Sequence, residues 1–508
     1  MEKTIAGPET DVEISEAASG PKRHPRGLMT LFFTEMWERF SYYGMRALLI
    51  LFLTAAVQEG GFGLTDATAT AIYGLYTASV YLVGLPGGWI ADRVMGQRNA
   101  VFLGGTIIAL GHFSMALGAV FTFYLGLVLI VIGTGLLKPN VSAIVGDLYP
   151  EGGARRDAGF SIFYMGINLG AFIGPLLCGF LGEKINWHLG FAAAGVGMVL
   201  GLIQYRMGYK YLGDAGQMRD ENAATRSRAI RSLIAGIALV AVVAGILALL
   251  QSAGTVNITP RGVAKSLGVI IPSLAVLYFI YQGFFGGFDT VERKRIGVIF
   301  VLFVAASLFW AGFEQAGSSM NLFAERLTNR VIFGWEMPTT WLQSVNPLFI
   351  IGFAPLVGSL WVALARRGKE PSIPAKFALG LIQLGAGFLV LAWASNYVGY
   401  SNGEVVKKVS PLWLVATYFL HTTGELCLSP VGLSSMTKLS PKKLVGQMMG
   451  IWFMASSFGN LIAGLVAGTM ERVSLVELFG IVAGTVIGAG LLLLAISRPV
   501  RNLIGGVR

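Results

Sequence analysis

The sequence predicts an all-α polytopic membrane protein with about fourteen transmembrane helices. Of its 508 residues, 54% are hydrophobic and only 13% are charged, and the mean hydropathy is +0.67. Soluble domains carry about 25% charged residues. The apolar residues also gather in stretches of about 20, the length of helix that spans a bilayer. Both observations indicate that the core of this protein is a bundle of membrane-spanning helices.

The apolar stretches follow one another along the whole chain. We expect spans near 28–56, 66–93, 99–120, 122–148, 157–182, 188–209, 230–251, 264–286, 295–320, 341–366, 374–396, 411–437, 443–469 and 474–497. Pro139 lies inside the fourth span and predicts a break in its helix. An even number of spans places both ends of the chain on one side of the membrane.

The positive charges of the short loops predict the orientation. They cluster on one side, near 93–98, 155–156, 293–295, 366–369 and 438–443. Cytoplasmic loops carry an excess of Lys and Arg, so this side and both termini are expected in the cytoplasm. The same rule accounts for the net charge of +11 without a nucleic-acid partner.

Composition divides the chain into two six-helix halves with an insertion between them. Residues 1–27 are polar and lack a signal-peptide pattern, which predicts a cytoplasmic tail. Residues 28–210 form the first bundle, and 211–294 contain a polar linker and a peripheral two-helix hairpin without intramembrane charge. Residues 295–498 form the second bundle, and 499–508 a second cytoplasmic tail.

The first span carries charges that a membrane helix ordinarily lacks. Each costs about 2.5–3.5 kcal/mol at the bilayer centre, so such residues face protein or water and mark functional sites. At about 100° per residue, the charged and hydroxyl-bearing side chains fall on one face within about 140°. They are Glu35, Glu38, Arg39, Tyr42, Tyr43 and Arg46. The alternative is a self-neutralised structural ion cluster.

Three further ionisable residues are expected inside the membrane. Lys138 requires a carboxylate partner, for which Glu35 and Glu38 are the candidates; the alternative is a lysine that snorkels to the interface. Glu314 and Glu425 belong to the second half, where each has the alternative of a hydrogen-bond anchor. A cationic wall from the first half would then face an anionic wall, which suits a small zwitterion such as an amino acid or a peptide.

Several polar and aromatic residues are weaker candidates. A single Asn or Ser in a membrane helix more often bonds a neighbouring helix, and a Trp more often lies at the membrane interface. A histidine one turn before Glu425 is more often neutral and packed than functional. These candidates are Tyr81, Asn168, Trp310, Asn346, Ser429, Trp452 and His421.

The sequence excludes several other kinds of chemistry. Cys178 and Cys427 lie in separate apolar spans, so neither a disulfide framework nor a metal site is expected. A GxxxxGK[ST] motif is absent, as is any soluble stretch long enough for an ATPase domain. We expect no enzymatic activity, no catalytic residues and no cofactor, and intramembrane carboxylates beside bases indicate coupling to protons.

Five segments carry the resemblance to a known family. Residues 35–43 match ExxERFxYY, a signature of the proton-dependent oligopeptide transporter family of the major facilitator superfamily. Residues 160–172 (FSIFYMGINLGAF) resemble the fifth-helix signature of that family, and 88–98 resemble the cytoplasmic loop motif of the superfamily. Residues 138–140 and 309–315 also fit.

The resemblance runs from about residue 28 to residue 498 and implies a major facilitator fold of the bacterial type. It also implies a proton-coupled symporter that imports di- and tripeptides by alternating access. The residues that it implies for the peptide carboxylate are Arg39, Tyr43 and Lys138; for the amine and backbone, Asn168, Asn346 and Glu425; for side-chain pockets, Tyr81, Trp310, Ser429 and Trp452; and for proton coupling, Glu35, Glu38, Lys138, Glu314 and Arg46.

Two further expectations follow from the resemblance. Arg46 would pair with Glu314 across the two bundles on the extracellular side. Mammalian members carry a proton-handling histidine in the second helix, where this chain has Gly74, so coupling would depend on the carboxylates.

Two other functions stay open at this stage. One is a transporter of the same family for another small solute, such as nitrate or an amino-acid-like compound. The other is a membrane receptor that binds peptides without transporting them. In either case we expect a monomer in the bacterial inner membrane.

Overall fold

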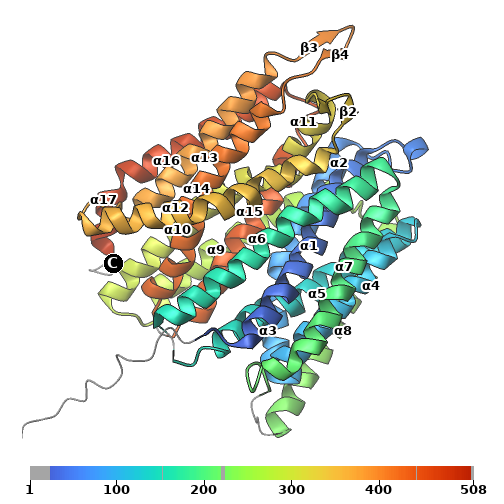
Figure 1. Cartoon of the computed structure of the whole chain (residues 1–508). Helices are drawn as coiled ribbons and strands as arrows, with labels where there is room; N and C mark the ends of the chain where they lie inside the picture. The colour runs from blue at the N-terminus through green and yellow to red at the C-terminus, as the bar shows by residue number, and fades with distance from the viewer. Residues whose placement is uncertain (1–22, 152, 219–222, 442, 505–508) are drawn as a thin grey trace, which may run out of the picture.

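Fourteen long helical segments, one at each expected span, form the fold in the part of the chain that the structure describes (Figure 1). The structure is a computed structural model that describes residues 23–151, 153–218, 223–441 and 443–504. The first six segments are α1 (Arg26–Thr54), α2 with α3 (Asp66–Leu82 and Gly84–Ile90), α4 (Gln97–Met115), α5 (Val120–Asp147), α6 (Gly153–Lys184) and α7 (Trp187–Gly208). The remaining eight are α8 (Ala223–Ser252), α9 (Pro260–Phe285), α10 (Thr290–Phe313), α12 (Val345–Arg366), α13 (Ile373–Ser395), α14 (Leu412–Leu439), α15 (Val445–Ala467) and α16 (Leu475–Ala495).

Eleven of the described helical segments are both long and apolar enough to cross a membrane. The three long helices outside this group are α1, α4 and α14. For α1 the reason is the cluster of Glu35, Glu38 and Arg39, which interrupts its apolar sequence. The chain is therefore a multi-pass membrane protein, and its most polar long helices require shielding by their neighbours.

The helices form two bundles, as predicted. In the first bundle α1 packs against α6 and α7, and α4 packs against α5 and α7; in the second, α13 packs against α14 and α16 (Figure 1). The main contacts between the bundles are those of α2 with α15 and of α6 with α12. Most residues of α1 are buried, among them Glu35, Glu38, Arg39 and Arg46, so its charged face is enclosed by protein rather than by lipid.

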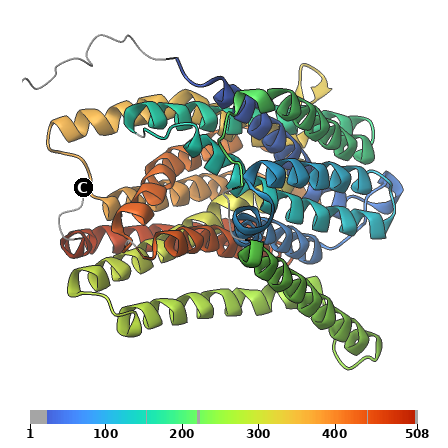
Figure 2. The same cartoon turned by 90° about the horizontal axis from the view of Figure 1, so that it is seen from below.

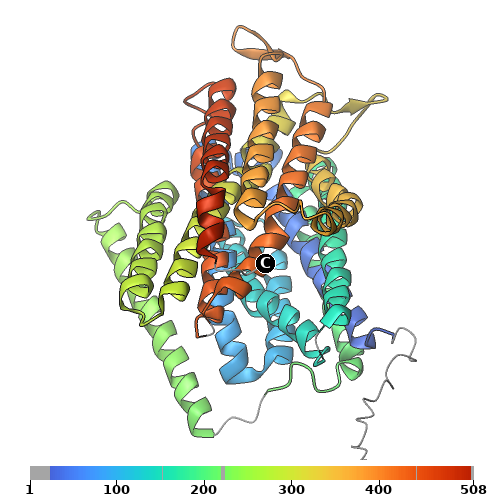
Figure 3. The same ribbon diagram turned by 90° about the vertical axis from the view of Figure 1, so that its left-hand side faces the viewer.

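The predicted hairpin of α8 and α9 lies at the edge of the bundles (Figures 2 and 3). Ala229 is the one described residue of α8 that is buried, whereas α9 packs against α2, α10 and α15. A helix that is apolar on all sides and almost fully exposed in the protein is covered by lipid in a membrane.

Two spans differ from the prediction: one that was expected to be a single helix is interrupted, and one that was expected to be broken is continuous. The second span bends after Leu82, because the Pro86 ring clashes with the carbonyl four residues before it, and it ends in a π-helical turn, η2 (Ala91–Met95). The predicted break at Pro139 is wrong, since α5 continues through it. Membrane helices tolerate proline where neighbouring helices and nearby groups satisfy the freed backbone carbonyl.

Short elements connect the long helices. They are the 3-10 turns η1 (Val57–Glu59), η3 (Tyr209–Tyr211), η4 (Glu314–Gly317) and η5 (Thr339–Ser344), the helices α11 (Ser319–Leu327) and α17 (Ser497–Leu503), and the strands β1 (Val331–Ile332), β2 (Trp335–Glu336), β3 (Gly399–Ser401) and β4 (Glu404–Lys407). The strands form two small antiparallel hairpins. We call the end of the molecule that carries them the hairpin end; it is uppermost in Figure 1.

The structure describes only part of the two predicted tails, residues 1–27 and 499–508. Residues 1–22 and 505–508 of the predicted tails lie outside the described residues. At the C-terminal side α17 folds onto the second bundle, where Arg295 donates to the Ile504 carbonyl at 3.1 Å. The positions of the domain boundaries in the linker stay a prediction, and residues 219–222 of that linker also lie outside the described chain.

Candidate functional site

A cavity of about 140 Å³ lies between the two bundles. The first bundle lines it with residues of α1, α2 and α6, and the second with residues of α10, η4, η5, α12 and α14. The polar and aromatic lining residues are Tyr43, Arg46, Tyr81, Tyr164, Asn168, Trp310, Phe313, Glu314, Gln343, Asn346, Tyr418, His421 and Glu425. Helices far apart in the sequence thus bring one cation and two carboxylates of the predicted set to one cavity.

The predicted pair of Arg46 and Glu314 is present. Arg46 Nη2 lies 2.7 Å from Glu314 Oε2, and Arg46 Nε donates to the Tyr73 hydroxyl at 2.5 Å. Glu314 follows the last residue of α10, so the end of that helix directs its carboxylate toward α1. Both side chains are buried, and the pair joins the first bundle to the second.

The cluster at residues 35–39 is paired within itself. Arg39 Nε lies 3.1 Å from Glu35 Oε1 and also contacts Glu38. Its guanidinium carbon lies 5.2 Å from the centre of the Tyr42 ring. None of the three charged residues lines the cavity, although all three were predicted to belong to the site.

The predicted ion pair of Lys138 with Glu35 or Glu38 is not formed in the part of the chain that the structure describes. Lys138 Nζ instead lies 4.3 Å from the centre of the Tyr81 ring, a cation–π contact. Arg39 takes the carboxylates because it is on the same helix, four residues after Glu35, which is the spacing of neighbours on a helix face. Lys138 still interacts electrostatically with both carboxylates.

At the same cavity, α12 and α14 form a polar pair. Asn346 Nδ2 donates to Glu425 Oε2 at 3.3 Å and to Thr422 Oγ1 at 2.9 Å. The amide therefore orients the carboxylate at the cavity wall. His421 packs against the ring of Phe388, with 4.9 Å between ring centroids, as a packed histidine does.

Lys138, like Glu35, Glu38 and Arg39, is not part of the cavity lining, and two further predicted residues also lie away from it. Trp452 is buried in the core of the second bundle, where its ring lies 6.4 Å from that of Phe377. Ser429 is one turn beyond Glu425 on α14 and does not reach the lining.

Four of the polar and aromatic lining residues were not predicted: Tyr164, Phe313, Gln343 and Tyr418. Tyr164 lies within the 160–172 signature, so a closer reading of that motif was the available signal.

Gly74 lies where α2 crosses α15. A Cβ atom at this position would lie 3.1 Å from the Gly464 Cα and 3.3 Å from the Asn460 carbonyl oxygen, so the crossing leaves little room for a side chain. An imidazole at this position would force the two bundles apart.

Two groups of polar contacts join the bundles at the hairpin end. Arg326 of α11 binds the Asp66 carboxylate with two hydrogen bonds of 2.7 and 2.8 Å. Glu183 of α6 accepts hydrogen bonds from the backbone N–H groups of Thr339 and Thr340, at 2.7 and 2.9 Å. Glu183 thereby caps the first turn of η5, which continues into α12. Neither contact was predicted, because carboxylates in loop-adjacent turns are common and carry no sequence signal of their own.

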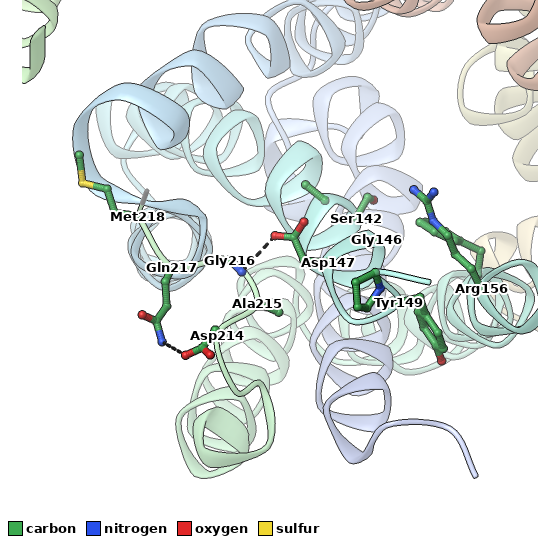
Figure 4. Close-up of a pocket in the computed structure, with 13 residues that line it drawn as sticks. Ser142, Gly146, Asp147, Tyr149, Arg156, Asp214, Ala215, Gly216, Gln217 and Met218 are labelled. Carbon is green, nitrogen blue, oxygen red and sulfur yellow. Dashed lines mark hydrogen bonds between the residues drawn. The ribbon is translucent and has the colours of Figure 1, made fainter. Parts of the chain in front are cut away.

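A larger cavity of about 630 Å³ lies at the opposite end, within the first bundle (Figure 4). The segment 214–218 forms one wall, which Asp147 holds by accepting from the Gly216 N–H at 3.2 Å. Arg156 lies across the cavity from this wall (Figure 4). The cavity contains none of the predicted site residues and lies within one bundle, so it is not the candidate site.

Comparison with known proteins gives concordant matches. The family model described as "POT family" matches residues 98–484. The chain is 46% identical over 499 residues to a protein named peptide transporter YePEPT from Yersinia enterocolitica, covering 96% of both chains. It is 37% identical over 495 residues to a di-/tripeptide transporter from Lactococcus lactis, covering 95% of this chain and 97% of that protein. Its fold matches a crystal structure of a peptide transporter POT in complex with sulfate, with a TM-score of 0.87, 42% identity and coverage of 96% and 97%.

Proposed function

The chain belongs to the POT family, a family of membrane transporters, and from this premise we propose that it imports di- and tripeptides together with protons by alternating access. Two relatives with nearly full-length matches are named as peptide transporters, one of them for di- and tripeptides. We propose further that it acts in the bacterial inner membrane, as a monomer, with both termini in the cytoplasm and without a cofactor.

The observation that carries the proposal is the charge distribution of the central cavity. Arg46 lies at one wall and the Asn346–Glu425 pair at another, and both bundles contribute to the lining. A zwitterionic peptide places its carboxylate and its ammonium group several ångströms apart, so Glu425 of the second bundle would bind the ammonium group while cations of the first bundle bind the carboxylate. Charge-assisted hydrogen bonds of this kind are the stronger ones in proteins.

The Arg39 cluster supplies a way to couple protons to peptide. Arg39 is held by Glu35 and Glu38. When one of these carboxylates takes a proton, Arg39 loses part of its partner charge and becomes available, with Tyr43 and Lys138, to a peptide carboxylate. Asn168, Tyr81 and Trp310 would contact the rest of the peptide from the cavity wall. Ser429 and Trp452 would take part only after the helices move.

Uptake into proteoliposomes tests the proposal. A pH gradient, acidic outside, should drive accumulation of labelled dialanine, and Lys138→Ala should abolish it. Lys265→Ala is the matched control, because Lys265 is an exposed lysine of the peripheral α9. Accumulation by Lys138→Ala at the wild-type rate would contradict the coupling role of Lys138.

A second variant tests the anionic wall. Glu425→Gln keeps the hydrogen bond from Asn346 but removes the charge. Its affinity should fall much more for peptides with a free amine than for N-acetylated peptides, and equal losses would contradict an amine site at Glu425. Binding of dialanine without uptake would indicate a receptor, and uptake of nitrate in place of dialanine would indicate the anion-transporter alternative.

A further inference from the structure

A column of tyrosines lies between the two buried ion clusters of the first bundle. On α1, Glu38, Tyr42 and Arg46 follow one another at intervals of four residues, so they lie on one face about 6 Å apart along the axis. The antiparallel α2 lies beside α1 and presents Tyr76 and Tyr73 to this face. Arg46 Nε donates to the Tyr73 hydroxyl at 2.5 Å, and the rings of Tyr42 and Tyr76 stack with centroids 6.4 Å apart.

The hydroxyls at the middle of this column are buried and have no hydrogen-bond partner among the described residues. Tyr42 and Tyr76 are 3% and 5% exposed, and both hydroxyl oxygens lack a partner there. One carboxylate oxygen of Glu38, the next group along α1, is also buried and also lacks a hydrogen-bond partner among the described residues. Buried polar groups in native proteins are almost always hydrogen-bonded, to water where the protein offers nothing. Three such groups in one column mark a place for bound water.

The charged groups around the column define its two ends. Tyr42 interacts electrostatically with Arg46 and Glu314 toward the hairpin end. Tyr76 interacts with Glu38 at the other end, where Arg39 covers the Tyr42 ring. From α5, Lys138 interacts with Glu38, Glu35 and Glu314. The column therefore connects the carboxylate at the bundle interface to the carboxylates of the Arg39 cluster.

We propose that Tyr42 and Tyr76, with bound water between them, relay protons between Glu314 and Glu38. The inference rests on the proposed proton coupling. In each transfer a hydroxyl oxygen accepts a proton from the group before it while its own O–H proton passes to the group after it. One O–H bond forms for each that breaks, no tyrosine stays charged, and the net change is loss of a proton by the Glu314 carboxyl and its gain by the Glu38 carboxylate. Tyr42 and Tyr76 carry the proton, and neither belongs to the lining of the cavity between the bundles.

Variants that lose only the tyrosine hydroxyl distinguish a proton relay from a packing role of the ring. Tyr42→Phe and Tyr76→Phe keep the stacked rings. Each should lower the rate of dialanine accumulation driven by a pH gradient by at least about tenfold, the scale of a positioned proton-transfer group. Exchange of labelled for unlabelled dialanine without a pH gradient should stay near the wild-type rate, because exchange requires no net proton movement. Tyr205→Phe is the control, since Tyr205 is a fully buried tyrosine of α7 whose hydroxyl bonds the Arg98 carbonyl.

The outcomes distinguish the relay from the function on which it rests. Wild-type accumulation rates in both variants would overturn the relay, and so would equal losses of accumulation and exchange, which indicate a structural role. A wild-type protein that exchanges dialanine but does not accumulate it under a pH gradient would overturn proton coupling itself, and the relay with it.

Discussion

The backbone contacts of Glu183 predict how strongly the hairpin end is held closed. Glu183, on α6, caps η5 with hydrogen bonds of 2.7 and 2.9 Å to the N–H groups of Thr339 and Thr340. This contact joins the two bundles, and it must break if the hairpin end opens. Glu183→Gln keeps the size of the side chain and one acceptor oxygen but removes the negative charge.

The magnitude follows from the bonds that are weakened. Hydrogen bonds to charged groups contribute about 1.5–3 kcal/mol each, whereas neutral ones contribute about 0.5–1.5 kcal/mol. The charge also interacts favourably with the partial positive charge at a helix start. In the open state water would solvate either the native carboxylate or the substituted amide, so the closed state alone loses stability. A loss of about 1.5–3 kcal/mol shifts the equilibrium toward the open state by about 10- to 150-fold.

Distances between spin labels measure this shift. Val57 of η1 and Val406 of β4 are both 67% exposed, lie at the hairpin end and belong to different bundles. Cysteines introduced at these sites can be labelled selectively, because Cys178 and Cys427 are buried. Glu183→Gln should increase the population of long distances between the labels.

The control variant removes the charge of a helix-capping glutamate whose contacts stay within one bundle. Glu477 is part of the capping box of α16, within the second bundle, so Glu477→Gln should leave the distances unchanged. An unchanged distribution in Glu183→Gln would show that its contacts do not hold the hairpin end closed.

Two further predictions concern the packing and the ion pairs. A Cβ at Gly104 would lie 2.6 Å from the Gly133 carbonyl oxygen of α5, so Gly104→Leu should destabilise the protein by about 1–3 kcal/mol and lower its melting temperature in detergent. Gly236→Leu, on α8 where nothing lies within 4 Å of an added Cβ, should melt like the wild type. Arg46→Lys should slow dialanine accumulation, since a single ammonium group cannot reproduce the planar fork that bonds Glu314 and Tyr73 at once; uptake at the wild-type rate would show that charge alone suffices.

The sequence predicted the helices well because their signal is local. An apolar stretch of about 20 residues between polar loops has one stable solution in a bilayer, and each of the fourteen expected spans contains a long helix. The pairing of Arg46 with Glu314 was also foreseen, but from a family resemblance, since nothing in residues 46 or 314 alone identifies the other as its partner.

The failures have separate physical causes, and for Lys138 the cause is competition between partners. Lys138 was expected to bind a carboxylate of α1, but Arg39 reaches both carboxylates from the same helix at a lower cost in chain entropy. The Glu183 cap could not be predicted, because the groups that donate to it are backbone N–H groups about 156 residues away, and backbone groups have no sequence identity. The prediction of a break at Pro139 failed because membrane helices tolerate proline where neighbouring groups satisfy the freed backbone carbonyl.

Apart from Glu425, the proposed partner of the peptide ammonium group, the charges of the site sum to zero, and this balance predicts how protons and peptide depend on each other. Three carboxylates (Glu35, Glu38 and Glu314) interact with three cations (Arg39, Arg46 and Lys138), so three negative and three positive charges cancel. A peptide carboxylate entering this set leaves one uncompensated negative charge, which one bound proton neutralises. The binding of proton and peptide must then favour each other by the same factor. The affinity for dialanine should therefore rise as the pH falls, whereas a C-amidated dialanine, which brings no carboxylate, should bind with little pH dependence. Binding measured at several pH values, with both compounds, tests the balance, and equal pH dependence of the two would refute it.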